Sequence, residues 1–383
     1  MKKTLLSIAI MAVAAGVMSA ADVIVENRSF ADEKLPEPRV YVASEMTPAS
    51  QKHAVVTKAI SSVEEVCGNY LMWFQPKSTG TVPKYSGVKI KKINAQKVSI
   101  EGFWSSLCNP ITATVDFANS KLLIAPQVIL TDDTYGDCDI ASWVEKWYGL
   151  AIYRDKNIEV AINGNTLTFI SNWGIFINSG SQADKYFEMS DNTVLTRATA
   201  EMELLGKNAV EPTSVVVYGV LNDRNIAITN FGGFGQTVTA TAYNDDTVYI
   251  PQQVAYSYYN GTEVIDYQTW LVNPETNTLT GKIINNGKMT KEKLTFGPWG
   301  VFYKNDSGSY SGYMFVSSTI RFTDGSTFDC MLGVDEVKVD KEVASTKYVN
   351  ISGQESSRPF DGINVKVTTF TDGTTKAEKV FVR

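Results

Sequence analysis

The stretch ITATVDFANSKLLIAPQVI (residues 111–129) returns later in the chain as VTATAYNDDTVYIPQQVA (residues 238–255). Both stretches begin with residues that alternate in polarity, pass through a turn into a second apolar run, and place a glutamine, Gln127 or Gln253, shortly after a proline. Alternation with a period of two is typical of a strand with one buried face. The repetition therefore predicts a duplicated β domain.

Two flanking matches keep the same order and similar spacing. VSIEGF (98–103) corresponds to IAITNF (226–231), and LTFISNWGIF (167–176) corresponds to LTFGPWGVF (294–302). Turn signals such as Asn-Gly separate the alternating runs, and roughly seven or eight strands are expected in each copy. The predicted fold class is all-β, with two tandem antiparallel meander barrels or sandwiches.

The N-terminus has the pattern of a secretory signal peptide. Lys2 and Lys3 precede an apolar run, and the small residues Ser19, Ala20 and Ala21 supply a cleavage site. No later run approaches the ~18 consecutive apolar residues of a membrane span. Without Lys2 and Lys3, the 35 basic residues fall to 33 against 41 acidic ones, a net charge of −8. This balance argues against nucleic acid as a partner.

The length of 383 residues predicts more than one hydrophobic core. We expect a signal peptide at 1–21, an N-terminal extension at 22–62, β-repeat domain 1 at 63–180, β-repeat domain 2 at 181–332, a charged linker at 333–346 and a C-terminal domain at 347–383. The extension is expected to lend a strand to the first copy. One segment, DIASWVEKWYG (139–149), has helical spacing, with Asp139 and Gly149 as caps, and predicts a short helix at one end of the first barrel.

The final stretch, KYVNISGQESSRPFDGINVKVTTFTDGTTKAEKVFVR (347–383), alternates between glycine-marked turns. Its motif residues are Tyr348, Gly353, Gly362, Gly373 and Lys379. The stretch resembles the type A C-terminal sorting domain of proteins that the type IX secretion system of Bacteroidetes exports, with Asn364 where that family usually has an aromatic residue. The resemblance implies a small β-sandwich-like module, the secretion machinery as a partner, and removal of the tail. It also implies passage through the periplasm to the outer-membrane surface or the exterior.

The repeated domains carry a second resemblance. The pattern NFGG (230–233), VTAT (238–241) and IPQQ (250–253) looks like that of lipocalin- or calycin-like repeat domains in secreted Bacteroidetes proteins. This resemblance brings no catalytic residues with it.

Four cysteines, Cys67, Cys108, Cys138 and Cys330, allow three disulfide pairings in an oxidising compartment. We favour Cys108 with Cys138 because both lie in the first copy. A zinc site is not expected, since no C-x-x-C occurs and His53 is the only histidine. Catalysis by a serine or cysteine nucleophile would also have to use His53, which lies in a poorly patterned segment.

Acidic residues give two candidate sites. Asp132, Asp133, Asp137 and Asp139 gather in TDDTYGDCD (131–139) and are a candidate calcium site, because calcium takes several oxygen ligands from a turn. Glu201 and Glu203 in AEMELL (200–205) would share one strand face, as the two carboxylates of a glycosidase require. A solvated loop and a solvated strand face are the alternatives.

The aromatic residues suggest a binding function. Trp173 and Trp299 occupy equivalent repeat positions, which favours a packing role, whereas Trp73, Trp104, Trp143, Trp147 and Trp270 lack an aligned tryptophan. The candidate ligand-binding residues are Trp104, Trp143, Trp147, Tyr148, Tyr256 and Tyr258. The leading hypothesis is a non-enzymatic exported protein that binds a glycan or a protein without a cofactor. The alternatives are a carboxylate-dependent carbohydrate hydrolase and a lipocalin-style carrier of an apolar ligand.

Overall fold

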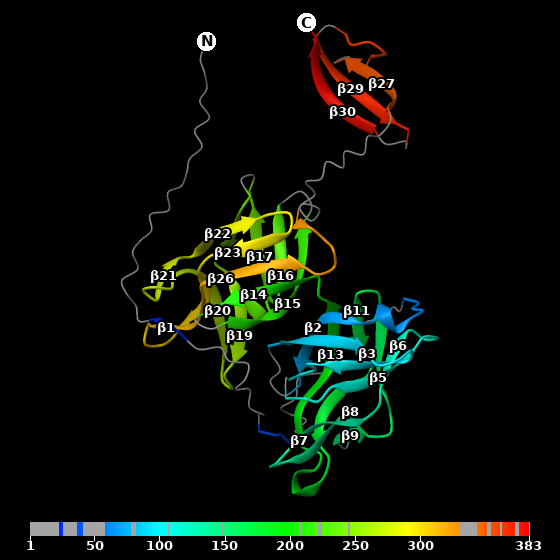
Figure 1. The fold of residues 1–383 in the computed structure, drawn as a ribbon, viewed down its shortest axis with the longest axis vertical. Helices are drawn as coiled ribbons and strands as arrows, with labels where there is room; N and C mark the ends of the chain where they lie inside the picture. Colours follow the sequence, from blue (N-terminus) through cyan, green and yellow to red (C-terminus); the bar gives the residue numbers. More distant parts are fainter. Residues whose placement is uncertain are drawn as a thin grey trace. The chain divides into compact units, whose positions relative to one another are not determined.

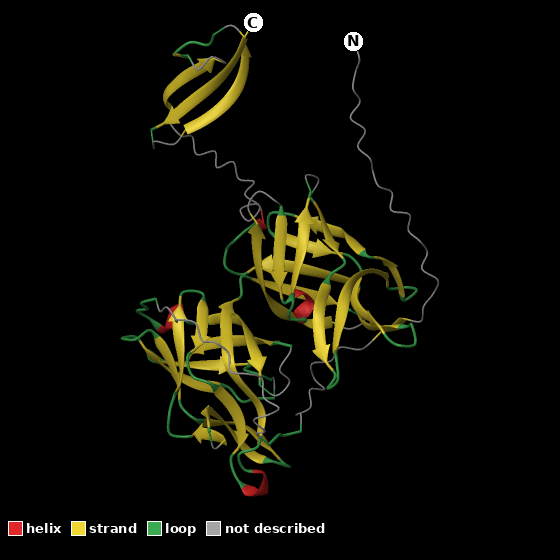
Figure 2. Cartoon of the chain, turned by 180° about the vertical axis from the view of Figure 1, so that it is seen from behind, coloured by secondary structure: helices red, strands yellow, loops and turns green. Residues whose placement is uncertain are grey.

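The computed structural model forms two compact units, residues 1–332 and 333–383, which are described separately (Figure 1). It describes residues 23–25, 37–40, 58–77, 82–105, 107–147, 149–206, 209–220, 224–243, 246–328, 343–350, 354–360, 362–371 and 375–382. The predicted signal peptide, His53, Cys330, Tyr148, Gly353 and Gly373 lie outside these residues. Strands dominate the described chain, and short 3-10 turns make up most of its helical content (Figure 2). None of the described helices is long and apolar enough to cross a bilayer.

The first copy of the repeat is a closed eight-stranded antiparallel barrel. β13 pairs with both β11 and β2, and this double pairing closes the barrel. The turn η3 (Val63–Glu65) precedes the first barrel strand. The barrel strands are β2 (Gly68–Pro76), β3 (Lys84–Lys92), β4 (Lys97–Glu101), β5 (Ile111–Asp116), β6 (Lys121–Ile124), β10 (Ile158–Asn163), β11 (Thr166–Phe169) and β13 (Tyr186–Arg197).

The barrel is not a simple meander, because the chain leaves it after β6. It forms β7 (Gln127–Asp132), β8 (Gly136–Lys146) and β9 (Gly149–Tyr153) before it returns as β10. β12 (Trp173–Ile177) pairs with the first half of β13 and with β8, so β12, β8 and β7 continue the barrel's sheet beyond β13, and β9 pairs with β8. We call β7, β8, β9 and β12 the excursion sheet. The turn η4 (Gly180–Gln182) connects β12 to β13.

The second copy repeats this plan. Its closed barrel contains β14 (Ala200–Leu205), β15 (Ala209–Val220), β16 (Asn225–Thr229), β17 (Thr237–Ala242), β18 (Thr247–Pro251), β22 (Ile283–Met289), β23 (Lys293–Phe296) and β26 (Ser317–Phe322). Its excursion contains β19 (Val254–Tyr259), β20 (Val264–Asn273), β21 (Thr278–Gly281), β24 (Trp299–Lys304) and β25 (Tyr310–Phe315), and η5 (Phe231–Gly233) follows β16. The repeat thus covers both barrels and both excursions, which is more than the matched sequence stretches.

Equivalent side chains build the two cores. The indole of Trp173 packs 4.9 Å from Phe103 and donates to Thr193 Oγ1 at 2.8 Å. The indole of Trp299 packs 4.5 Å from Phe231 and donates to Ser318 Oγ at 3.0 Å. Both tryptophans are fully buried. The packing role predicted for this pair is thus the one that the structure shows.

The segment predicted as a helix is a strand. β8 spans Gly136–Lys146, and Ile140, Ala141, Ser142 and Trp143 are buried one after another. One face of β8 lies against the main core of the first copy, and the other packs in a small cluster with Phe176 and Met189. Because a strand buried on both faces carries consecutive apolar residues, its pattern is easily confused with a helical stripe.

The structure also differs from the sequence predictions at the end of the first copy and in the N-terminal extension. β13, which closes the first barrel, ends at Arg197, so the first copy extends past the predicted limit at residue 180. The N-terminal extension does not lend its strand to the first copy. β1 (Val23–Val25) pairs in parallel with β25 of the second copy, and Arg39 forms an isolated bridge with Tyr186, at the start of β13. Two described parts of the extension, Val23–Val25 and Arg39, thus pair with corresponding strands of the two copies.

The C-terminal unit is one four-stranded antiparallel sheet in its described residues, rather than a sandwich. Its strand order is β28 (Glu355–Ser356), β27 (Val343–Asn350), β29 (Gly362–Phe370) and β30 (Thr375–Val382). β27 begins inside the predicted linker. Tyr348 lies in β27, Gly362 begins β29 and Lys379 lies in β30. Asn364 is buried, and its side-chain amide bonds both the N–H and the carbonyl of Phe360.

Candidate functional site

Side chains fill the interiors of both barrels. In the first copy, inward residues such as Phe74, Val98, Ile111 and Leu167 are buried in one cluster. The second copy has an equivalent cluster that includes Met202, Ile226 and Phe296. An eight-stranded barrel is just wide enough for side chains to fill it. The packed interiors argue against a carrier that holds an apolar ligand inside a barrel.

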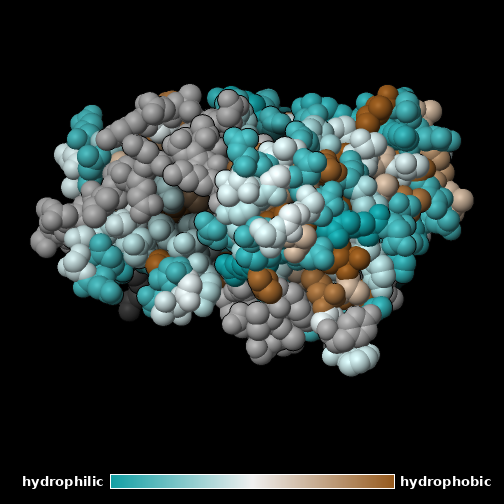
Figure 3. Space-filling model, turned by 90° about the horizontal axis from the view of Figure 1, so that it is seen from below, coloured by the Kyte–Doolittle hydropathy of each residue, from teal (hydrophilic) through white to brown (hydrophobic). Residues whose placement is uncertain are grey.

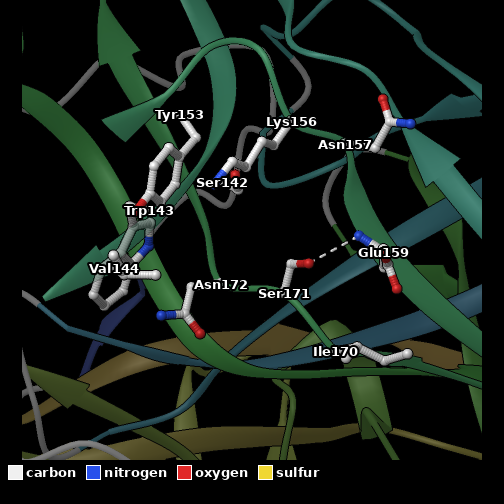
Figure 4. Close-up of a pocket in the computed structure, with 10 residues that line it drawn as sticks. All are labelled: Ser142, Trp143, Val144, Tyr153, Lys156, Asn157, Glu159, Ile170, Ser171 and Asn172. Atoms are coloured by element: carbon white, nitrogen blue, oxygen red, sulfur yellow. Dashed lines mark hydrogen bonds between the residues drawn. The ribbon is translucent and has the colours of Figure 1, made fainter. Parts of the chain in front are cut away.

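A pocket of about 580 Å³ opens beside the excursion sheet of the first copy. Its volume is within the range of small-molecule sites. Figure 4 shows Trp143 and Tyr153 together on one side and Asn157 and Glu159 on the other, with Ser171 between them. The complete lining is Ser142, Trp143, Val144, Tyr153, Lys156, Asn157, Glu159, Ile170, Ser171 and Asn172.

Two loops that differ between the copies form much of this pocket. Between β9 and β10 the first copy has Arg154, Asp155, Lys156 and Asn157, whereas between β21 and β22 the second copy has Lys282 alone. Between β11 and β12 the first copy has Ile170–Asn172, and the second has the shorter Gly297–Pro298. The site therefore lies where the first copy departs from the shared plan.

Hydrogen bonds to β10 hold the β11–β12 loop in place. The backbone N–H groups of Ile170 and Ser171 both donate to the carbonyl of Glu159, at 2.8 and 3.2 Å. The N–H of Glu159 donates in return to Ser171 Oγ at 3.1 Å. In the second copy a side chain holds the corresponding loop, because the amide of Asn286 accepts from the N–H of Gly297 and donates to the carbonyl of Pro298.

Trp143 and Tyr153 form the aromatic wall of the pocket, and Asn157 and Glu159 form a polar wall that is more exposed. Trp143 is only 3% exposed, and its indole N–H donates to the carbonyl of Trp173 at 2.8 Å. The ring of Tyr153 is half-buried, and the ammonium of Lys156 lies 3.9 Å from its centre. The carboxylate of Glu159 accepts from Lys121 Nζ at 2.7 Å. Amide, hydroxyl and carboxylate groups facing an aromatic wall suit a ligand that is apolar on one face and hydroxylated on its edges.

The aromatic residues predicted to bind a ligand lie in different parts of the fold. Of the five members of the set that the structure describes, Trp143 alone lines the pocket; Trp147 is 96% exposed, and Trp104 packs against the first core with φ of 64°. Tyr256 is half-buried in the second copy, with its ring 5.1 Å from that of Tyr267. Tyr258 is 49% exposed near the end of β19. The predicted set is thus not one site.

Three of the four aspartates of the candidate calcium loop, Asp132, Asp137 and Asp139, bond to different partners. Asp132 Oδ1 accepts from the backbone N–H groups of Thr134 and Tyr135. Asp137 accepts from the hydroxyl of Thr131, and buried Asp139 accepts from Arg154 Nε at 2.7 Å. Among the residues described, no three potential metal ligands gather in one place.

The candidate carboxylate pair lies on the outer side of the second barrel. Glu201 and Glu203 alternate with the buried residues Met202 and Leu204, so both side chains point away from the core. Glu203 pairs with Arg321 at 2.8 Å, and Glu201 accepts from Asn69 at 3.2 Å. The two glutamates share a strand face, as the sequence predicts, but each has its own partner.

The predicted disulfide is not formed. Cys138 is a buried thiol in β8 that bonds the carbonyl of Gly136 at 3.5 Å, and it is not joined to Cys108. Burial raises the pKa of Cys138 to about 11, and the nearby carboxylates of Asp132, Asp139 and Asp137 act in the same direction.

Tyr153, Lys156, Asn157, Glu159, Ser171 and Asn172 were not among the predicted site residues. The signal that could have found them is the length difference between FISNW and FGPW, together with the extra residues before IEV (158–160). Comparison of the chain with family models, with curated proteins and with solved structures finds no match in any of the three.

Proposed function

We propose that this protein is a non-enzymatic glycan-binding protein, exported by a type IX secretion system and displayed on, or released from, the cell surface. The observation that carries the proposal is the pocket at Tyr153. It combines aromatic side chains with hydroxyl, amide and carboxylate groups, and it is built in part from two loops that are longer than their counterparts in the second copy. A duplicated scaffold needs no such loops for its own folding, so their presence supports a separate function.

A saccharide fits the chemistry of this pocket. One face of a pyranose ring is formed by C–H groups and stacks on aromatic rings, while its hydroxyls exchange hydrogen bonds with amides and carboxylates. Tyr153 supplies the ring, and Asn157, Glu159 and Asn172 supply both donors and acceptors. A binding role is favoured over hydrolysis because Glu201 and Glu203 lie outside this pocket on the outer barrel surface.

The surface supports a polar ligand. On the face seen in Figure 3, hydrophobic residues form small separate patches among polar ones. Broad exposed apolar patches are the usual mark of a protein–protein site. A glycan is therefore our preferred ligand, and a protein ligand is an outcome that the binding experiment can reveal.

Export rests on the C-terminal unit. The resemblance of residues 347–383 to the type A sorting domain and the separate fold of residues 333–383 both support a detachable delivery module. The expectation is that a chain lacking residues 347–383 stays in the periplasm, while the full chain reaches the exterior. Secretion of the truncated chain would contradict the delivery proposal without affecting the binding one.

The binding proposal is tested with purified mature protein on an array that carries glycans and proteins, followed by calorimetry. Tyr153→Ala and Asn157→Ala should each weaken binding at least severalfold. Tyr258→Ala is the matched control, because it removes an exposed tyrosine of the second copy and should leave binding unchanged. Binding that survives Tyr153→Ala but not Tyr258→Ala would place the site in the second copy instead, and an array hit on protein ligands alone would replace the glycan.

A further inference from the structure

The charges that line the pocket at Tyr153 do not balance. Glu159 is neutralised, because its carboxylate lies 2.7 Å from Lys121 Nζ. Lys156 is exposed, and within the described residues its recorded contact is the ring of Tyr153 rather than a carboxylate. One positive charge therefore remains at the mouth of the pocket. In a protein with an excess of acidic residues, this local sign is the reverse of the overall one.

The position of this charge is set by the tyrosine ring. The Lys156 ammonium lies 3.9 Å from the centre of the Tyr153 ring, and that of Lys146 lies 5.7 Å from the same centre. A cation is attracted to the face of an aromatic ring, and the attraction grows as water is excluded. The ring of Tyr153 thus holds the Lys156 ammonium beside a pocket whose other polar lining groups are neutral or, in the case of Glu159, already paired.

An uncharged ligand would offer no opposite charge to the Lys156 ammonium. A sugar that covered the pocket would remove water from the Lys156 ammonium without giving it an opposite charge, and partial desolvation of a charge is costly. A carboxylate or sulfate on the sugar would replace the lost water with a charge-assisted hydrogen bond, which is stronger than a neutral one.

We propose that the pocket selects anionic saccharides, and that Lys156 is the residue that contacts the acidic group. The inference rests on the proposed glycan-binding function and adds the charge class of the ligand. Tyr153 holds the sugar ring, Asn157 and Asn172 bond neutral hydroxyls, and Lys156 meets the carboxylate or sulfate.

The second copy supplies a matched control. Lys282 is exposed and is the single residue that connects β21 to β22, where the first copy has the loop containing Lys156. Lys282→Gln removes the same charge from the corresponding place on the other copy. Lys156→Arg keeps the charge, and Lys156→Gln removes it with little change in side-chain size.

The experiment measures the affinity of the full mature chain for three oligosaccharides that share one backbone: neutral, uronate-bearing and sulfated. Wild type and Lys282→Gln should bind the anionic forms more tightly than the neutral one, by roughly two- to fivefold for an exposed ion pair, and the preference should shrink at high salt. Lys156→Gln should lose the preference and its salt dependence but keep its affinity for the neutral sugar. Lys156→Arg should retain the preference.

The three ligands also separate the two sources of negative charge, since a preference for only the uronate or only the sulfate identifies the acidic group. Equal binding of neutral and anionic sugars by the wild type would overturn this inference and leave the glycan-binding proposal standing, as would an unchanged preference in Lys156→Gln. If the wild type binds none of the three and no other array glycan, both proposals fall together.

Discussion

Gln127 and Gln253 make the same three hydrogen bonds at corresponding positions of the two copies. The side-chain amide of Gln127 accepts from the N–H of Thr112 at 2.8 Å and donates to the carbonyls of Thr112 and Ala125 at 2.9 Å. Gln253 does the same with Thr239 and Pro251. The amide takes the place of a strand where the chain leaves each barrel, because it offers the same donor and acceptor as a peptide group.

Gln127→Ala and Gln253→Ala should each lower the free energy of unfolding by about 1 kcal/mol, the usual net value of such bonds at partly exposed sites. Gln127→Glu should not rescue the loss, because a carboxylate cannot donate to the two carbonyls. Chemical denaturation checks the effect, with exposed Gln96→Ala as control. An alanine variant as stable as the control would show that water replaces the amide without cost.

On the outer faces of the two excursion sheets, the large and the small residue stand at opposite positions in the two copies. By strand register, Ala141 corresponds to Trp270, since they pair with Gly174 and Gly300. Trp143 then corresponds to Val272, so the tryptophan occupies a different position in each copy. Trp143→Val alone should cost about 3 kcal/mol through the cavity it leaves.

The double change Ala141→Trp with Trp143→Val should recover part of that loss, because it imitates the second copy and keeps the buried volume. Thermal unfolding of the two single variants and the double variant measures the coupling. Strictly additive losses would mean that the two sheets do not pack their outer faces alike.

Stability should fall at alkaline pH. The pKa of Cys138 rises from an ordinary 9.0 to about 11 in the folded chain because the thiol is buried, and burial likewise raises the pKa of Tyr70 from 10.0 to about 12. Above pH 9 the unfolded chain loses these protons before the folded chain does, so the free energy of unfolding decreases as pH rises through 11.

Urea unfolding at pH 8 and pH 10.5 tests this dependence. Cys138→Ala should lose stability at both pH values through its smaller side chain but show a shallower decline between them. A decline as steep as that of the wild type would assign the effect to other groups.

Within the N-terminal extension, Val23–Val25 pairs with the edge of β25, and Arg39 bridges the start of β13. Because an uncovered edge offers unpaired backbone groups to a second chain, removal of residues 22–40 should promote self-association. Light scattering at several concentrations compares this variant with the mature chain and with a shorter deletion of residues 22–25, which uncovers only β25. A fully truncated chain of unchanged mass would contradict the expectation.

The sequence was a good guide wherever one face of a strand meets water. The all-β class, the duplication and the equivalence of Trp173 and Trp299 all follow from period-two alternation and from matched aromatic positions. The prediction failed at β8, because burial on both faces erases that alternation. The disulfide prediction failed because shared membership of one domain does not bring Cys108 and Cys138 into bonding distance.

The candidate site was harder to predict for a different reason. Tyr153, Glu159 and Ser171 come from three segments that meet only once the barrel and its excursion have folded. Trp147 and Tyr258 drew attention as aromatics, but aromatic composition does not show which rings share a cavity. The signal in the sequence that marks this site is the difference in loop length between the copies, not their likeness.

The pairing of Val23 with Tyr310 joins a segment near the start of the chain to β25, the last strand of the second excursion. Such a contact closes a very long loop, so it forms late and slows folding. In a polypeptide that emerges N-terminus first, β1 can pair with β25 only after most of the chain has emerged. Under the export proposal, the delay would keep the chain accessible to chaperones, and the docking of Val23–Val25 onto β25 would be the last step of its folding.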